Sequence, residues 1–122
     1  MNRDELARVL LGLDGVGCAA AAVAVSVDER VVGSVDPSHR VRVSVAVALG
    51  ATSVVLGRAA VRRPARRRDL EIAAVVNLGW VAACCVGLSR APSRPGRGLL
   101  ITTALLDGVA AAAQWYLRPS VR

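Results

Sequence analysis

The sequence predicts an all-α protein, a four-helix antiparallel transmembrane bundle that forms a single domain over residues 1–122. Two observations favour this class. Hydrophobic residues make up 54% of the 122 residues and the mean hydropathy is +0.48, which is more apolar surface than a water-soluble domain of this size can readily bury. The apolar residues also fall into four segments of about 20 residues, each about 30 Å long as a helix, which matches the hydrocarbon core of a bilayer.

The first two predicted helices cover 6–27 and 37–62. A cleaved signal peptide is the alternative interpretation of the first segment, but Asp14 interrupts its apolar run and the run is too long for such a peptide. The second segment is preceded by Asp36 and Pro37. An aspartate N-cap followed by proline is a typical helix start, so this helix is expected to begin at Pro37.

The third and fourth predicted helices cover 70–89 and 99–117. Asp69 is placed to cap the third helix, and Glu71 lies in its first turn, where the helix dipole favours negative charge. The stretch 91–98 is rich in proline, glycine, serine and arginine, so it is expected to be a loop.

The distribution of positive charge predicts the orientation of these helices. All 16 Lys and Arg residues are arginines, against 9 acidic residues, a composition typical of a GC-rich bacterial genome. Ten arginines lie in the two termini and the second loop, and six lie in the other two loops. By the positive-inside rule, both termini and the second loop are expected on the cytoplasmic side of the bacterial plasma membrane.

The arginine-rich second loop is expected to contact lipid rather than nucleic acid. It joins two predicted spanning segments and has no aromatic pattern of the kind that nucleic-acid sites use. Arginines next to a membrane attract anionic lipids. The predicted headgroup contacts are Arg62, Arg63, Arg66, Arg67 and Arg68.

Polar residues inside the apolar segments are the candidate functional residues. An ionisable group at bilayer depth costs about 2.5–3.5 kcal/mol on insertion scales, so such groups usually face the protein interior or a water path. The predicted intramembrane polar cluster consists of Asp14, Arg58, Asn77, Asp107 and Gln114.

Two partners are open for the acid in the first helix. Asp14 is expected to pair directly with Arg58 near the inner leaflet, because the long arginine side chain can reach along its helix. In the alternative, Arg58 extends to the headgroups and Asp14 bonds Asn77 or a hydroxyl. Asp107 lies nearer the midplane with no arginine at its depth. It is therefore either a neutral acid that donates one interhelical hydrogen bond or an acid that binds a proton or cation.

The remaining residues argue against catalysis and against a metal or cofactor. His39 is the single histidine and lies beside the first loop, so no Ser-His-Asp or Cys-His arrangement and no ordinary zinc site is expected. The three cysteines, Cys18, Cys84 and Cys85, are expected to behave as small apolar groups.

Several residues resemble those of known membrane proteins. The spacing from Arg8 to Asp14, the arginine-rich second loop, and Asn77 with Trp80 in the third segment resemble small four-helix integral membrane proteins of GC-rich bacteria. The overall plan is also similar to the DoxX-like group. An acid in the first helix and an aromatic in the third are similar to the small multidrug resistance transporters, although those proteins use Glu where Asp14 stands and contain more aromatic residues.

These observations predict a non-enzymatic multi-pass membrane protein that packs against a copy of itself or a partner membrane protein. The alternative is a small proton-coupled transporter or channel subunit in which Asp14 or Asp107 titrates. A third interpretation is an accessory component of lipid modification that holds headgroups with its arginine loop.

Overall fold

The computed structural model describes residues 1–90 and 93–118, which form five α-helices and no β-strand. The all-α prediction is therefore confirmed. Four helices of 23 to 25 residues are long and apolar enough to cross a membrane. The helices are α1 (Arg3–Val27), α2 (Glu29–Gly33), α3 (His39–Val61), α4 (Arg67–Ser89) and α5 (Arg94–Leu117).

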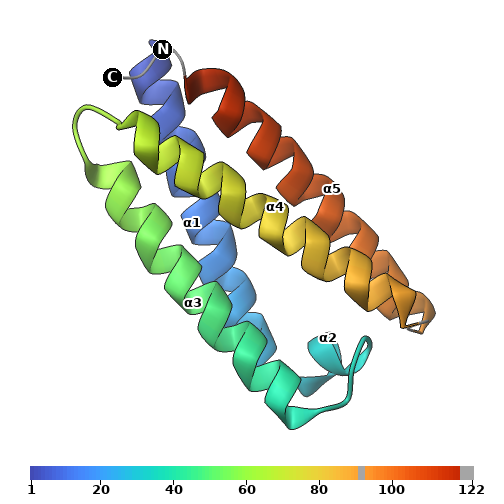
Figure 1. Ribbon diagram of the computed structural model, residues 1–122. Helices are drawn as coiled ribbons and strands as arrows, with labels where there is room; N and C mark the ends of the chain where they lie inside the picture. The colour runs from blue at the N-terminus through green and yellow to red at the C-terminus, as the bar shows by residue number, and fades with distance from the viewer. Residues whose placement is uncertain (91–92, 119–122) are drawn as a thin grey trace.

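The long helices form two helical hairpins. α1 packs along α3, and α4 packs along α5, while contacts between the two pairs are far fewer. Figure 1 shows the pairs crossing and then diverging toward the end of the molecule that carries α2. We call this the α2 end. The opposite end, which carries the N-terminus, the end of α5 and the loop between α3 and α4, is the terminal end.

Polar side chains start α1 and α5 earlier than the apolar segments begin. The side chain of Asn2 accepts a hydrogen bond from the backbone N–H of Glu5, and the Glu5 carboxylate accepts one from the N–H of Asn2. This capping box extends α1 back to Arg3. Likewise, Ser93 Oγ accepts from the N–H of Gly96, so most of the loop expected at 91–98 is the first turn of α5. Residues 91–92 of that loop lie outside the described part of the chain.

The predicted starts of α3 and α4 are wrong in detail. α3 begins at His39, because the carboxylate of Asp36 accepts from the N–H of Ser38 and closes a turn instead of capping a helix. α4 begins at Arg67, two residues before the predicted cap. Asp69 therefore lies in the first turn of α4, where it is only 9% exposed.

The short helix α2 was not predicted, because five residues are too few to show helical periodicity. It bridges the two hairpins at the α2 end. Ser93 Oγ, at the start of α5, donates to the carbonyl of Ser34, just after α2, at 2.7 Å. Arg90, just after α4, forms an ion pair with Asp36 at 3.7 Å.

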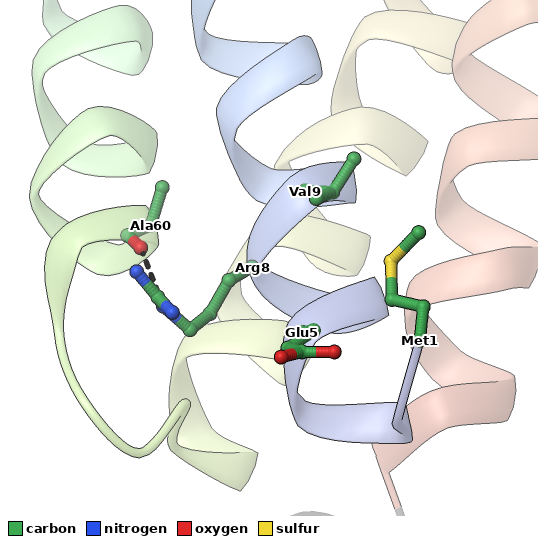
Figure 2. Close-up of a pocket in the computed structure, with 5 residues that line it drawn as sticks. All are labelled: Met1, Glu5, Arg8, Val9 and Ala60. Atoms are coloured by element: carbon green, nitrogen blue, oxygen red, sulfur yellow. Dashed lines mark hydrogen bonds between the residues drawn. The ribbon is translucent and has the colours of Figure 1, made fainter.

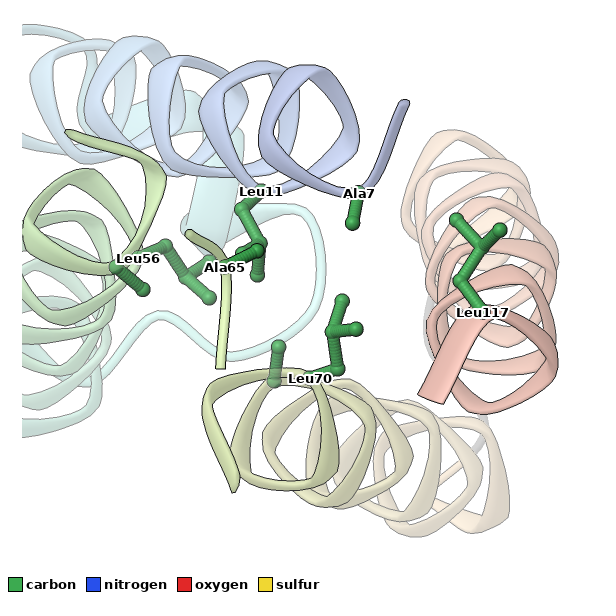
Figure 3. Close-up of a cluster of buried hydrophobic side chains, with 8 residues drawn as sticks. Ala7, Leu11, Leu56, Ala65, Leu70 and Leu117 are labelled. Carbon is green, nitrogen blue, oxygen red and sulfur yellow. The ribbon is translucent and has the colours of Figure 1, made fainter. Parts of the chain in front are cut away.

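The hydrophobic core lies at the terminal end, where side chains from all four long helices converge (Figure 3). Its members are Ala7, Leu11, Leu56, Ala59, Ala65, Leu70, Ala73 and Leu117. Elsewhere the helices keep little of their apolar surface inside: at most 22% of the most apolar window of any long helix is buried. Most of the apolar side chains therefore point outward, as in a bundle surrounded by hydrocarbon.

Candidate functional site

Three polar side chains meet between the two hairpins and form a closed set of hydrogen bonds. Asn77 Nδ2 on α4 donates to Asp14 Oδ2 on α1 at 2.6 Å, and Gln114 Nε2 on α5 donates to the same oxygen at 2.7 Å. Asn77 Nδ2 also donates to Gln114 Oε1 at 3.0 Å. Asn77 and Gln114 are each 1% exposed. This polar triad ties α1 to both helices of the other hairpin.

The triad lies well inside the bundle. Asp14 is eleven residues into α1 and Asn77 ten residues into α4, which places each about 15 Å or more from the terminal end of its helix. A carboxylate oxygen that accepts two amide N–H groups keeps much of the stabilisation it would lose on leaving water. The triad therefore holds the carboxylate of Asp14 between the two hairpins with two amide donors and without a basic partner.

The predicted pair between Asp14 and Arg58 is wrong, and the alternative in which Asp14 bonds Asn77 is found instead. Gly15 faces α3: a Cβ atom added there would lie 3.3 Å from both the backbone nitrogen of Gly57 and the Cβ of Leu56. Consecutive residues of a helix point about 100° apart, so Asp14 turns away from α3 toward the other hairpin. Arg58 is exposed and makes no ion pair with any described residue.

Asp107 lies near the triad but outside its hydrogen bonds. It is half-buried on α5, about two turns from Gln114. Within residues 1–90 and 93–118 its carboxylate has no hydrogen-bond partner and no ion pair, so the expected interhelical hydrogen bond is not formed. Of the five predicted cluster residues, three form the triad, Asp107 lies beside it and Arg58 is outside.

The five arginines of the α3–α4 region fall into two groups, two that form ion pairs within the chain and three that do not. Arg62 forms an ion pair with the buried Asp69 at 2.8 Å, and Arg67 pairs with Glu71 at 2.9 Å. The other three are exposed, and among the described residues they form no ion pair: Arg63, Arg66 and Arg68. These three guanidinium groups remain available to an anionic ligand.

Two further arginines, which were not predicted as structural residues, cap helix ends within the α1–α3 hairpin. Arg8 near the start of α1 donates to the carbonyl of Ala60 at the end of α3, at 3.0 Å (Figure 2). Arg42 near the start of α3 donates to the carbonyls of Val25 and Ser26 at the end of α1, at 2.9 and 2.6 Å. The last carbonyls of a helix have no hydrogen-bond donor within that helix. Here an arginine of each helix donates to carbonyls at the end of the other helix.

A surface depression at the terminal end offers no comparable site. It is open, and its lining includes Arg8, whose guanidinium is already committed to Ala60 (Figure 2). Within the described ranges, no group of three or more His, Cys, Asp or Glu side chains is placed to hold a metal ion. The polar triad is therefore the candidate functional site.

Comparison with protein-family models, curated proteins and solved structures finds no match to this chain. The resemblances to the DoxX-like group and to the small multidrug resistance transporters stay predictions.

Proposed function

We propose that this chain is a multi-pass integral membrane protein of the bacterial cytoplasmic membrane that acts by binding rather than by catalysis. One observation carries the proposal. The polar side chains of the triad are bonded to one another, whereas at most 22% of the most apolar window of each long helix is buried. The interior is thus used for holding the bundle together, and the outer surface is left for lipid and for another protein.

The binding partner in this proposal is a second copy or another membrane protein. In hydrocarbon, helices associate through close packing and interhelical hydrogen bonds, because lipid is as apolar as the helix surface. The outward faces contain many alanine and glycine residues, such as Gly17, Ala20 and Ala24 on α1, which are all exposed. Small residues of this kind permit close approach of a partner helix.

The orientation in this proposal follows the arginines. Both termini and the α3–α4 loop face the cytoplasm, and the exposed guanidinium groups of Arg63, Arg66 and Arg68 contact the headgroups of anionic lipids. Arg62 and Arg67 serve the fold instead, because acids within the chain already neutralise them.

The experiment uses the native cysteines of the full chain. Cys85 is exposed on α4, whereas its neighbour Cys84 is buried. Membranes containing the chain are washed with alkaline carbonate and treated with a bifunctional thiol reagent. We expect the chain to stay in the membrane and to be cross-linked through Cys85 to a copy or a neighbour, while a variant that keeps only Cys84 gives no adduct. Release by carbonate, or a purified chain that stays monodisperse without detergent, contradicts the proposal.

A further inference from the structure

An arginine at the end of α5 is largely enclosed but only partly neutralised. The Arg118 side chain is 19% exposed, and its Nε atom is buried without a hydrogen-bond partner among the described residues. The described acid that pairs with it is Glu71 on α4, whose Oε1 lies 3.7 Å from Nε. That separation is too long for a hydrogen bond, so Arg118 keeps its capacity to donate to another acceptor.

A second arginine holds the same acid more closely. Arg67 Nε donates to Glu71 Oε1 at 2.9 Å, across one turn of α4. Two guanidinium groups thus share one carboxylate oxygen, and Arg67 has the shorter contact. Because a guanidinium group is always charged in proteins, these three side chains carry one positive charge in excess. The longer contact of Arg118 places most of that excess on Arg118.

An aromatic ring orients the guanidinium group of Arg118. Its Cζ atom lies 3.5 Å from the centroid of the Trp115 ring, about one turn earlier on α5. Stacking on an aromatic face covers one flat side of a guanidinium group and leaves the N–H groups at its edge. Those N–H groups are the ones that bind two oxygen atoms of a phosphate or carboxylate at once. The stacked Arg118 therefore has the preparation that such a contact requires.

The surroundings of Arg118 suit a lipid. Trp115 is 49% exposed and Tyr116 68% exposed, at the end of a helix that is long and apolar enough to cross a membrane. Tryptophan and tyrosine are enriched where a membrane meets water. Arg118 belongs to α5 and its acid to α4, so the guanidinium group lies between the ends of two such helices. Basic sites in this position bind the headgroups of anionic lipids.

We propose that Arg118 binds the phosphate group of an anionic phospholipid in the leaflet at the terminal end. Trp115 orients its guanidinium group, and Arg67 is a positioning residue that keeps Glu71 from neutralising it. The inference rests on the membrane location proposed above and requires no protein partner. It adds one oriented site to the exposed arginines of the α3–α4 loop.

The fluorescence of Trp115 tests the site in the purified full chain. The sequence contains two tryptophans, Trp80 and Trp115, so Trp80→Phe leaves Trp115 as the reporter. Phosphatidylglycerol with brominated acyl chains, which quench a tryptophan on contact, is titrated into mixed micelles of detergent and phosphatidylcholine. The salt concentration is about 1 M, where attraction between exposed charges is screened beyond about 3 Å. We expect half-quenching at a mole fraction about tenfold lower than with brominated phosphatidylcholine, as for a charge-assisted hydrogen bond.

Matched variants in this background locate the effect. Arg118→Gln should raise the half-quenching fraction of phosphatidylglycerol about tenfold, to the value for phosphatidylcholine. Arg63→Gln removes the same charge from an exposed side chain in the loop before α4 and should change that fraction less than about twofold, because screening removes its long-range effect. Equal effects of the two variants, or equal quenching by both lipids before either substitution, overturn the proposal.

A change of opposite sign keeps the proposal testable if Arg118→Gln fails to fold. Glu71→Gln removes the acid that competes for Arg118, so the half-quenching fraction of phosphatidylglycerol should fall. An unchanged or higher fraction in Glu71→Gln overturns the role of Arg118.

A competition arm separates a lipid from a free anion. Inorganic phosphate replaces part of the salt at constant ionic strength and should leave the quenching by brominated phosphatidylglycerol unchanged. Loss of that quenching at millimolar phosphate overturns the assignment to a lipid. Carbonate extraction tests the membrane location separately, so a chain that stays in the membrane but shows no preference for phosphatidylglycerol rejects this site alone.

Discussion

At the scale of single residues, the carboxylate of Asp14 has two amide donors where an arginine was expected. Hydrogen bonds from Asn77 and Gln114 to one oxygen are charge-assisted, and such bonds are stronger than those between neutral groups. An amide pair also avoids the cost of removing a guanidinium group from water. The two buried amides in turn need the Asp14 carboxylate, because it accepts a hydrogen bond from each of them.

Truncation of the acid is expected to weaken the bundle. Asp14→Ala leaves donors of two buried amides without their acceptor, which costs about 1–3 kcal/mol in the free energy of unfolding. Asp14→Asn retains an oxygen that accepts one of these bonds, so its loss should be smaller. Reversible unfolding in mixed micelles of increasing SDS content measures both. Equal stability of Asp14→Ala and the wild-type chain would argue against a holding role for the triad.

Asp28 predicts a pH response at the junction of α1 and α2, outside the long helices. Its carboxylate accepts from the backbone N–H of Arg30 and then from the Arg30 side chain, and these bonds lower the pKa of Asp28 from its ordinary value of 3.8. A lowered folded-state pKa gives stability that is present above the unfolded-state pKa and is lost as pH falls through the folded-state pKa.

The junction should therefore loosen in acid, below the ordinary aspartate range, and not near neutrality. Amide hydrogen exchange at Arg30, with the intrinsic pH dependence of exchange subtracted, should show protection that declines in this range. Asp28→Asn, whose side chain does not titrate, should show protection that is independent of pH. The same acid-dependent decline in both proteins would exclude Asp28 as its cause.

At the scale of elements, the α1–α3 hairpin is closed at both ends by arginines. Arg8 and Arg42 each lie near the start of one helix and bind carbonyls at the end of the other. Antiparallel packing makes these reciprocal hydrogen bonds possible, because the start of each helix lies beside the end of its neighbour. Positive charge at a helix C-terminus is also favoured by the helix dipole.

Loss of one cap should be measurable against a neighbouring control. Arg42→Gln is too short to reach Val25 and Ser26, so we expect a loss of about 1–2 kcal/mol, within the range for hydrogen bonds that involve a charged group. Arg40→Gln removes the same charge two residues earlier, from a side chain that is exposed and has no partner among the described residues. Thermal unfolding in detergent compares the two. Similar unfolding temperatures for Arg42→Gln and Arg40→Gln would show that the hydrogen bonds of Arg42 add no stability beyond the effect of its charge.

The contact of α1 with α3 gives a second prediction for this hairpin. A Cβ atom at position 15 would lie 3.3 Å from the backbone nitrogen of Gly57 on α3, whereas a Cβ atom at Gly17 would meet nothing within 4 Å. Gly15→Val should therefore cost about 1–3 kcal/mol through overpacking, and Gly17→Val should cost much less. The same micellar unfolding assay applies. A greater loss at Gly17 would show that α1 is rotated relative to the orientation described.

At the scale of the whole molecule, the two ends are held together differently. The terminal end contains the hydrophobic core, with leucines from all four long helices. The α2 end is joined by the hydrogen bond between Ser93 and Ser34 and the ion pair between Arg90 and Asp36. The triad lies between them, so the hairpins are held firmly at one end and at the middle, and more weakly at the other end.

The proposed orientation predicts different outcomes for two triple variants with equal loss of charge. Arg63→Gln, Arg66→Gln and Arg68→Gln together leave seven arginines on the proposed cytoplasmic side against six on the other. By the positive-inside rule, this variant should insert in mixed orientations. Arg40→Gln, Arg94→Gln and Arg97→Gln together should keep a single orientation. Protease accessibility of a C-terminal tag in intact cells reports the side, and a tag exposed outside in the unmodified chain would reverse the proposed topology.

The span of each long helix could be predicted from the sequence, because it depends on the hydropathy and charge of consecutive residues. Bilayer-length apolar segments separated by Arg, Pro and Gly indicate four long helices whatever their neighbours are. Helix ends were less predictable, because a cap depends on which side chain turns back to the backbone. Asp36 closes a turn and Asp69 pairs with Arg62, although both have the sequence context of a cap.

The partners of the polar residues depend on how each helix is rotated toward its neighbours, and the hydropathy of a segment does not contain this information. Contact of Gly15 with α3 turns Asp14 toward Asn77 and Gln114 and leaves Arg58 outside. The polar residues of the interior were therefore recognisable in the sequence by their cost in a membrane, whereas their assembly into a triad required the long-range packing of α1 between α3 and the α4–α5 hairpin.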